Sequence, residues 1–318
     1  MTVVVSVYNK ARTVAKCISS ILEIDYPLKE TLIIEGYSSD GSYEILKQFE
    51  DKARIVRIQG NYATALNRAL ELVSTPLVAL TDADCTVDKG WLRELAEGFA
   101  EEEGVVAVAG YVGTGQGITL LATLIGIEFE ERYRRFPRYL LRSPTMNLCV
   151  RTEAARQIGF DQHLPVAIET DFGYRLTKLG KILYQPSAVV LHYPRTTWNG
   201  FFMQQVAFAR GAFMVYRMHK DKLKGDHIST FSMIWQVPLF CLACLFLFMG
   251  LLDCTCGAIS LVLFAALFLI YARDMARLPI RKKHYPMMAA ILCMRTVGWA
   301  AGAISGLATP MAQWMRKT

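Results

Sequence analysis

Short apolar runs and segments of helical periodicity alternate along residues 1–225. The apolar runs are rich in β-branched residues and predict buried strands at 2–7, 32–34, 55–58, 77–80 and 105–109. Between them, apolar positions recur at helical spacing and predict helices at 11–24, 42–49, 63–72 and 91–100. Strands and helices that alternate in this way indicate an α/β fold with an open, largely parallel sheet covered on both faces.

Farther along the chain the pattern becomes apolar throughout. The runs 229–252 and 254–272 carry no charge, and a third apolar segment predicts a helix at about 290–312. The first two runs are long enough to cross a bilayer as helices. In the third segment glycines recur every fourth residue over 298–306, a spacing that lets helices pack closely in lipid. We therefore expect about three transmembrane helices at the carboxyl-terminal end.

Composition and charge favour a membrane setting. The chain is 53% hydrophobic, and its formal charge is +7. Because the basic residues flank apolar helices, they suit anionic lipid headgroups better than nucleic acid, which we do not expect as a partner. The basic segment 273–284 belongs on the cytoplasmic side by the positive-inside rule. The eight cysteines show neither zinc spacing nor a disulfide framework, and no signal peptide is visible after Met1, so we expect a cytosolic, reduced catalytic domain.

Two carboxylates, Asp82 and Asp84, follow the predicted strand 77–80. Side chains alternate along an extended chain, so both aspartates point the same way. Like charges this close destabilise one another unless a cation lies between them. Mg²⁺ or Mn²⁺ suits the position because such ions combine one or two carboxylates with phosphate oxygens. A strand that ends in an aspartate-rich turn is the simpler alternative.

Other polar residues follow neighbouring strands. Asn9 ends the strand at 2–7, and Glu35 follows the strand at 32–34. Ligands of open α/β sheets bind beyond the carboxyl ends of the strands. We therefore expect Asn9, Glu35 and the two aspartates to face one site.

Three motifs resemble glycosyltransferase family 2, whose members are inverting enzymes of the GT-A fold. Val5-Ser6-Val7-Tyr8-Asn9 is similar to the family's opening strand, and Ile34-Glu35-Gly36-Tyr37-Ser38-Ser39-Asp40-Gly41 resembles its acidic turn. Thr81-Asp82-Ala83-Asp84-Cys85, followed by Gly90-Trp91-Leu92, resembles its metal motif and the helix after it. The resemblance covers roughly residues 2–215, and it is the combination of motifs that makes it specific.

The resemblance implies a nucleotide site and a metal site. It places the nucleotide of the donor against Ser6, Tyr8, Asn9, Glu35, Asn67, Asp82 and Ala83. It implies that a divalent metal (Mg²⁺ or Mn²⁺) is held by Asp82 and Asp84, with His192 able to approach it. A solvated turn is the alternative for Glu35, and a surface histidine for His192. Glu35 and Gly36 depart from the aspartates that are usual in the family, so the resemblance does not fix the base.

A later segment, Glu169-Thr170-Asp171-Phe172-Gly173-Tyr174-Arg175-Leu176, resembles the family's catalytic-base motif. Measured back from Arg175, Glu169 takes the position of the base and Asp171 that of the following acid. Ile168 stands where the family usually has an acid. Both acids are also compatible with a structural role at the start of a helix, where the helix dipole favours negative charge.

Arginines and glutamines in two segments are candidates for contact with the acceptor. The candidates are Arg132, Arg135, Arg138, Gln205 and Arg210. A run of mixed charge such as 128–142 is usually a solvated helix face, but its arginines could instead hold an acceptor phosphate at a membrane surface. The predicted helix 198–218 is aromatic-rich and amphipathic, as is typical of a helix that lies in the membrane interface.

These patterns combine into one domain plan. It consists of a GT-A catalytic domain (1–197), an amphipathic interfacial helix with linker (198–225) and a transmembrane region (226–318). The predicted function is metal-dependent, inverting transfer from a nucleotide-diphosphate sugar to a lipid-linked acceptor at the cytoplasmic membrane face, as in enzymes of exopolysaccharide and archaeal N-glycan assembly. Alternatives are a polyprenyl-phosphate sugar synthase and a non-catalytic nucleotide-sugar-binding subunit. A homo-oligomer or a glycan-assembly complex is compatible with either class.

Overall fold

The computed structural model describes residues 1–27 and 29–307 and divides into two compact units. The first unit contains Met1–Ile118 and Tyr133–Pro194. The second contains Thr119–Arg132 and the described residues from Arg195 onward. The segment 119–132, expected within the catalytic domain, thus belongs to the second unit.

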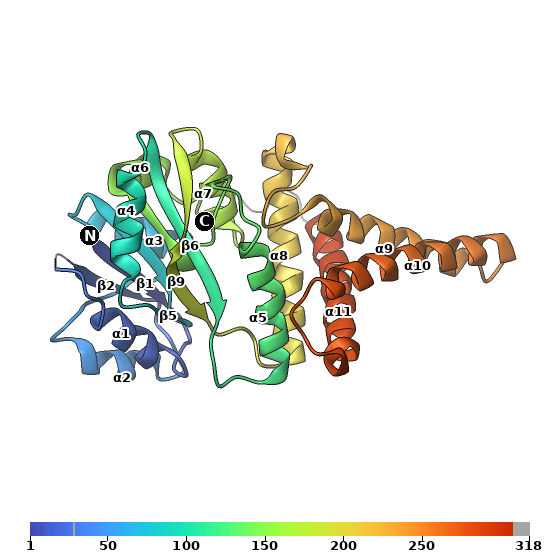
Figure 1. Ribbon diagram of the computed structural model, residues 1–318, viewed down its shortest axis with the longest axis horizontal. Helices are drawn as coiled ribbons and strands as arrows, with labels where there is room; N and C mark the ends of the chain where they lie inside the picture. The colour runs from blue at the N-terminus through green and yellow to red at the C-terminus, as the bar shows by residue number, and fades with distance from the viewer. Residues whose placement is uncertain (28, 308–318) are drawn as a thin grey trace. The chain divides into compact units, whose positions relative to one another are not determined.

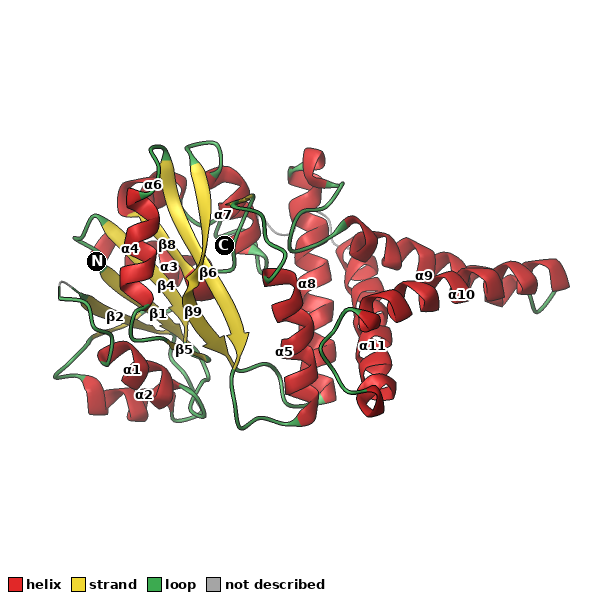
Figure 2. Cartoon of the chain, in the orientation of Figure 1, coloured by secondary structure: helices red, strands yellow, loops and turns green. Residues whose placement is uncertain are grey.

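The first unit is built on one mixed sheet, drawn in yellow in Figure 2. Its described strands are β1 (Thr2–Val7), β2 (Glu30–Glu35), β3 (Arg54–Arg57), β4 (Leu77–Asp82), β5 (Cys85–Val87), β6 (Val105–Thr114), β7 (Tyr139–Leu140), β8 (Leu148–Arg151) and β9 (Lys181–His192). They lie in the order β3-β2-β1-β4-β8-β6-β9-β5, and β7 pairs with β9. The strands β3, β2, β1 and β4 are mutually parallel, so their carboxyl ends share one edge of the sheet.

Helices cover both faces of this sheet, as expected. They are α1 (Val14–Leu22), α2 (Ser42–Leu46), α3 (Tyr62–Leu72), α4 (Trp91–Ala100), α6 (Thr152–Ile158) and α7 (Ile168–Leu176). On one face, Ile18 of α1 and Leu95 of α4 join the same core as Val5 of β1. On the other, α3 packs on β1 and β2, where Val4 and Ile34 are buried. Burial of both faces explains why the strands read as continuous apolar runs.

The sheet differs from the sequence prediction in three strands. Strands β5, β7 and β8 run antiparallel to their partners, so the sheet is less parallel than expected. Strand β9 runs without a break from Lys181 to His192. Its pairing with β6 shifts register between Gly110 and Tyr111, and this irregularity carries the strand past Pro186.

The second unit is helical. It comprises α5 (Leu120–Tyr133, whose last residue belongs to the first unit), α8 (Trp198–Met218), α9 (Phe231–Met249), α10 (Cys254–Ala276) and α11 (Tyr285–Leu307). Figure 1 shows α9 and α10 as a hairpin, in which Gly250 lies close against Gly257. Asp253 begins α10 by accepting a hydrogen bond from the backbone N–H of Thr255, at 2.8 Å.

Within the described residues, three helices are long and apolar enough to cross a membrane. They are Phe231–Met249, Cys254–Ala276 and Lys282–Leu307, which confirms three predicted spans with shifted ends. The expected continuation to 312 lies outside the described residues. In α9 and α10, large apolar side chains are more than half exposed, among them Leu245, Phe248, Leu261, Val262 and Leu269. Such faces suit lipid better than water.

Candidate functional site

The two aspartates lie at the carboxyl end of β4. Asp82 is its last residue, and Asp84 precedes β5. Ala83 and Cys85 are buried, whereas Asp82 and Asp84 are partly exposed. The alternation expected from the sequence therefore turns both carboxylates away from the core.

Asp82 is held by a tyrosine. The Tyr62 hydroxyl at the start of α3 donates to Oδ1 of Asp82, with 2.9 Å between the oxygens. The same hydroxyl lies 2.9 Å from Oγ1 of Thr145. Because Thr145 precedes β8, this bridge joins three parts of the chain at the edge of the sheet.

Asp84 is flanked by two basic side chains. Lys10, which follows β1, forms an ion pair with Oδ2 of Asp84. Nε2 of His192, the last residue of β9, lies 3.9 Å from Oδ1 of Asp84. His192 is thus next to the aspartate pair, where the resemblance places it.

Negative charge accumulates at this edge. Burial, together with the neighbouring charge of Asp84, raises the pKa of Asp82 to about 7. Burial and the two aspartates also raise the pKa of the thiols of Cys17 and Cys85, which lie beneath them. A site that resists holding both its negative charges is prepared to receive a cation.

The residues present fit a divalent metal shared with a substrate. Among the residues that the structure describes, no group of three or more His, Cys, Asp and Glu side chains forms a cage. Asp82 and Asp84 supply two carboxylates, and a substrate diphosphate would supply the remaining oxygens, as Mg²⁺ prefers. The donor set therefore suits a metal that binds together with a diphosphate.

Glu169 lies in the first turn of α7 and belongs to the same electrostatic cluster. Its charge acts on both Asp82 and Tyr62 and raises the pKa of each. Burial raises the pKa of Glu169 itself, and the nearby Arg142 only partly offsets this. Arg142 is fixed in turn, because its Nη1 donates to Oγ1 of Thr170 at 3.0 Å. The third acid thus arises from a segment far along the chain.

Asp171 forms an ion pair within its own helix. Its side chain is buried and forms an ion pair with Arg175, whose Nη2 is 2.6 Å from Oδ2. Arg175 also donates to the carbonyl oxygen of Gly159, at 2.7 Å, and so ties α7 to the turn after α6. This arrangement gives Asp171 a structural role and leaves Glu169 as the candidate base.

The ends of β1 and β2 are joined by Asn9. Its backbone N–H donates to Oγ of Ser38 at 3.0 Å, and its side-chain oxygen accepts from the N–H of Ser39 at 2.9 Å. Asn9 adopts a left-handed conformation, with φ at 53°, and leaves the side chain of Tyr8 62% exposed. Ser6 pairs in register with Asp82, so these residues line the edge that carries the acids.

Two residues assigned to the nucleotide by resemblance are engaged within the protein. The side chain of Asn67 donates to the carbonyl oxygen of Phe160 at 2.8 Å and accepts from its N–H at 2.7 Å. Glu35 is fully buried, and its carboxylate accepts from the N–H groups of Tyr37 and Ser38 and from Nε of Arg57. Contact of Asn67 or Glu35 with the nucleotide of a donor stays a prediction.

The acceptor candidates belong to several different elements. Arg138 pairs with Glu101 near the start of β6, at the sheet edge opposite to the acids. In the second unit, Arg132 pairs with Glu128, and the buried Gln205 accepts from Nε1 of Trp299. The exposed Arg135 precedes β7, and Arg210 lies within α8, where its backbone faces Gly302.

Three residues of the site escape the sequence prediction: Lys10, Tyr62 and Thr145. Lys10 directly follows the Tyr-Asn motif, which was a usable signal. Nothing in the sequence links Tyr62 to Thr145, because their contact depends on the position of β8 beside β4.

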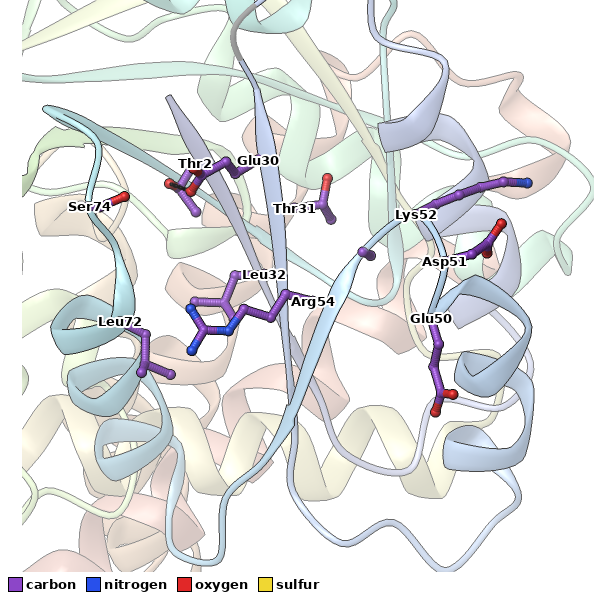
Figure 3. A pocket seen from close by; sticks show the side chains of 11 residues that line it. Thr2, Glu30, Thr31, Leu32, Glu50, Asp51, Lys52, Arg54, Leu72 and Ser74 are labelled. Atoms are coloured by element: carbon purple, nitrogen blue, oxygen red, sulfur yellow. Dashed lines mark hydrogen bonds between the residues drawn. The ribbon is translucent and has the colours of Figure 1, made fainter.

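A separate hollow of about 520 Å³ lies at the opposite edge of the sheet (Figure 3). It is lined by Thr2, Glu30, Thr31, Leu32, Glu50, Asp51, Lys52, Ala53, Arg54, Leu72 and Ser74. Thr2, Glu30 and Arg54 are the first residues of β1, β2 and β3. The hollow is therefore remote from the acids and forms no part of the candidate site.

Known proteins resemble this chain in sequence. The family model described as "Glycosyl transferase family 2" matches residues 2–164. Glycosyltransferase AglE of Haloferax volcanii is 25% identical over 247 residues, which are 70% of this chain and 76% of that protein. Poly-beta-1,6-N-acetyl-D-glucosamine synthase of Staphylococcus epidermidis is 24% identical over 72% of this chain and 58% of its own length. The chain thus spans little more than half of that synthase.

Solved structures share the fold, and one of them matches nearly the whole chain. It is the mannosyltransferase PcManGT from Pyrobaculum calidifontis in complex with GDP-Man and Mn²⁺. The TM-score is 0.59 at 17% sequence identity, and the match covers 95% of this chain and 86% of that one.

Proposed function

Because this chain belongs to glycosyltransferase family 2, we propose that it transfers a sugar, with inversion, from a nucleotide-diphosphate sugar to a lipid-linked acceptor at the cytoplasmic face of a membrane. The acceptor is a polyprenyl phosphate that carries a sugar or oligosaccharide, and the product serves polysaccharide or glycan assembly.

The donor binds at the carboxyl edge of β1, β2 and β4. Asp82 and Asp84 would hold Mg²⁺ or Mn²⁺, and Ser6, Tyr8, Asn9 and Ala83 lie along the same edge. The metal, when bound, would stabilise negative charge on the diphosphate. The presence of GDP-Man and Mn²⁺ in the structure of PcManGT supports this assignment. Lys10 lies close enough to Asp84 to add positive charge beside the leaving group.

Glu169 is the general base. Its carboxylate takes the proton from the acceptor hydroxyl while the hydroxyl oxygen attacks the anomeric carbon, and the bond to the nucleoside diphosphate breaks. Attack on the face opposite to the leaving group inverts the anomeric centre. The observation that carries this proposal is the pair of partly exposed aspartates at the carboxyl end of β4, with His192 at 3.9 Å from Asp84, in a chain of glycosyltransferase family 2. Glu169 is the partly buried acid in the first turn of α7.

The membrane setting points to a lipid-linked acceptor. Three long apolar helices accompany the catalytic unit in one chain, and the segment between α10 and α11 is basic. Basic loops stay on the cytoplasmic side, where nucleotide sugars are made, and this supports a catalytic unit on that side.

Transfer assays on the detergent-solubilised full chain test the proposal. Radiolabelled UDP- and GDP-sugars are offered with Mn²⁺ and either a bare polyprenyl phosphate or a sugar-bearing one. We expect label on the sugar-bearing lipid only, loss of transfer in Glu169→Gln, and loss on chelation of the metal. The matched control is Glu153→Gln, an exposed acid at the start of α6.

Other outcomes would assign the chain differently. Transfer onto bare phosphate that survives Glu169→Gln would indicate a polyprenyl-phosphate sugar synthase, because a phosphate nucleophile needs no base. Donor binding without transfer to any lipid would indicate a nucleotide-sugar-binding subunit.

A further inference from the structure

The strand order indicates where the base of a bound nucleotide falls. Along the carboxyl edge, Asp82 of β4 is followed by the ends of β1, β2 and β3, with Glu35 paired in register with Arg57. Neighbouring strands lie about 4.8 Å apart, so the end of β3 is about 14 Å from the aspartates. A nucleoside diphosphate anchored at Asp82 through its phosphates has the length to bring its base to the ends of β2 and β3.

An exposed aromatic ring is fixed at that place. Tyr37, in the turn after β2, is 52% exposed and adopts a left-handed conformation with φ at 59°. The guanidinium carbon of Arg57 lies 4.2 Å from the centre of its ring and 4.1 Å from that of Tyr43. Arg57 therefore supports one face of Tyr37, and solvent reaches the rest of the ring.

Glu35 accepts hydrogen bonds from both Tyr37 and Arg57. Its Oε2 accepts from the backbone N–H of Tyr37 at 3.1 Å and from Nε of Arg57 at 2.7 Å. Its Oε1 accepts from the N–H of Ser38 at 2.5 Å. Because Glu35 is completely buried and engaged through both oxygens, it fixes the turn without presenting a free carboxylate to a ligand.

A bulky residue at positive φ is uncommon and costs conformational energy. Because about half of Tyr37 is exposed to solvent, its ring adds little buried apolar surface that could offset this energy. The geometry therefore points to a ligand that uses the open face of the ring.

We propose that Tyr37, backed by Arg57, is the stacking platform for the nucleobase of the donor, and that Glu35 is its positioning residue. The inference rests on the proposed function, because it assumes a nucleotide donor. Every base has a π face, so a platform of this kind binds uracil and guanine nucleotides alike. Selection between them then depends on contacts other than the platform.

The test separates the base from the rest of the nucleotide. Calorimetry on the full chain in detergent, with Mn²⁺, compares UDP, GDP and the base-free ribose 5-diphosphate. Base stacking on an aromatic side chain changes affinity by about fivefold to a hundredfold. We expect Tyr37→Ala to weaken UDP and GDP by at least fivefold and to leave ribose 5-diphosphate unchanged, whereas Tyr37→Phe keeps wild-type affinity.

Two further variants sharpen the test. Tyr139→Ala removes a comparably exposed ring at the opposite sheet edge and should change no affinity. Glu35→Gln should weaken the binding of UDP and GDP, but not of ribose 5-diphosphate, and by less than Tyr37→Ala does.

The proposal is overturned if Tyr37→Ala leaves the binding of UDP and GDP unchanged, or weakens the binding of all three ligands equally. If wild type binds ribose 5-diphosphate as tightly as UDP and GDP, the base makes no contact; if it binds none of the three, the donor assignment itself fails.

Discussion

Glu169 is an acid whose surroundings oppose its charge. Burial raises the pKa of its carboxyl above the ordinary value of about 4.3, and the charge of Arg142 only partly offsets this. A general base works only when deprotonated, so acidification through this raised pKa should remove activity. We expect kcat/KM to fall on the acidic side with an apparent pKa above that of an ordinary glutamate, as measured in transfer assays from pH 4 to 9.

The control for this pH profile is a variant at the same residue. Saturating Mn²⁺ is used throughout, because a bound cation keeps Asp82 deprotonated. Residual transfer in Glu169→Gln should then lose the part of the acid limb that belongs to Glu169. Asp171→Asn should mainly reduce stability, because Asp171 is buried against Arg175. An acid limb that persists unchanged in Glu169→Gln would assign the titration to another group.

Asn67 offers a second residue-level prediction. Its side chain makes two hydrogen bonds with the backbone of Phe160, so it clamps α3 to the turn after α6. In Asn67→Ala the N–H and carbonyl of Phe160 lose these partners, and we expect a loss of about 1–3 kcal/mol in the free energy of unfolding. Chemical denaturation measures the loss, and Arg68→Ala, at an exposed neighbouring position, should be nearly neutral. A large rise in donor KM without loss of stability would instead restore Asn67 to the nucleotide site.

The pairing of acids is what the sequence reveals best at this scale. Asp82 and Asp84 are two residues apart, and the alternation of buried and partly exposed residues continues through the turn that carries Asp84 between β4 and β5. The engagement of Asn67 with Phe160, or of Glu35 with Arg57, depends on segments brought together by the fold and has no local signal. Sequence reasoning therefore predicted that Asp82 and Asp84 share one sheet edge, but not the hydrogen-bond partners of Asn67 and Glu35.

At the scale of elements, the glycines of α11 specify a close helix pair. Gly298 lies over Gln205 and Phe202 of α8, and a Cβ on Gly302 would clash with the carbonyl oxygen of Val206. The sequence predicted close packing from the four-residue spacing, and the structure confirms it with α8 as the partner. The partner itself was not predictable, since small residues indicate proximity without naming the surface that approaches.

Filling one of these positions should separate the two helices. We expect Gly302→Val to reduce stability by about 1–3 kcal/mol, the usual effect of overpacking. Thermal unfolding of the detergent-solubilised chain should show a lower midpoint, whereas Ala301→Val, on the exposed side of α11, should leave it nearly unchanged. Equal midpoints for the two variants would mean that α8 and α11 do not pack tightly in the detergent-solubilised protein.

The buried strands could be predicted from the sequence, whereas helix α5 could not. Buried strands such as β1 and β2 were found because both their faces are apolar, a signal that needs no knowledge of neighbours. Helix α5 carries apolar residues first and mixed charges later, and its sequence gave only weak signals. Its charges become intelligible only in the folded chain, where Glu128 contacts a residue from a distant helix.

At the scale of the whole molecule, the chain enters the helical unit twice. It first does so at Thr119–Arg132, between β6 and β7, and again from Arg195 onward. Within that unit, Glu128 of the first segment bonds Arg132, at 2.5 Å, and Arg295 of α11, at 2.7 Å. The carboxylate of Glu128 therefore links the inserted segment to helix α11.

The surroundings of Arg295 make this junction costly to break. Its side chain is buried, its Nη2 donates to Oε1 of Gln236 at 3.2 Å, and its guanidinium lies 4.7 Å from the ring centre of Trp299. Charged groups within spanning helices are expensive unless they are paired in this way. Removal of one partner of a buried ion pair leaves the other uncompensated, which costs about 3–5 kcal/mol.

Arg295→Met should therefore destabilise the protein strongly, although Arg132 still neutralises part of the charge of Glu128. We expect a lower midpoint of thermal unfolding in detergent and partial recovery in the double variant Glu128→Gln/Arg295→Met, because the unpaired carboxylate is then absent. Arg273→Met, which alters a half-exposed arginine at the end of α10, provides the matched control and should have little effect. If the two single variants unfold at the same temperature, the ion pair does not hold α5 to α11, and the attachment of this inserted helix must instead come from the apolar core around Leu124 and Leu292.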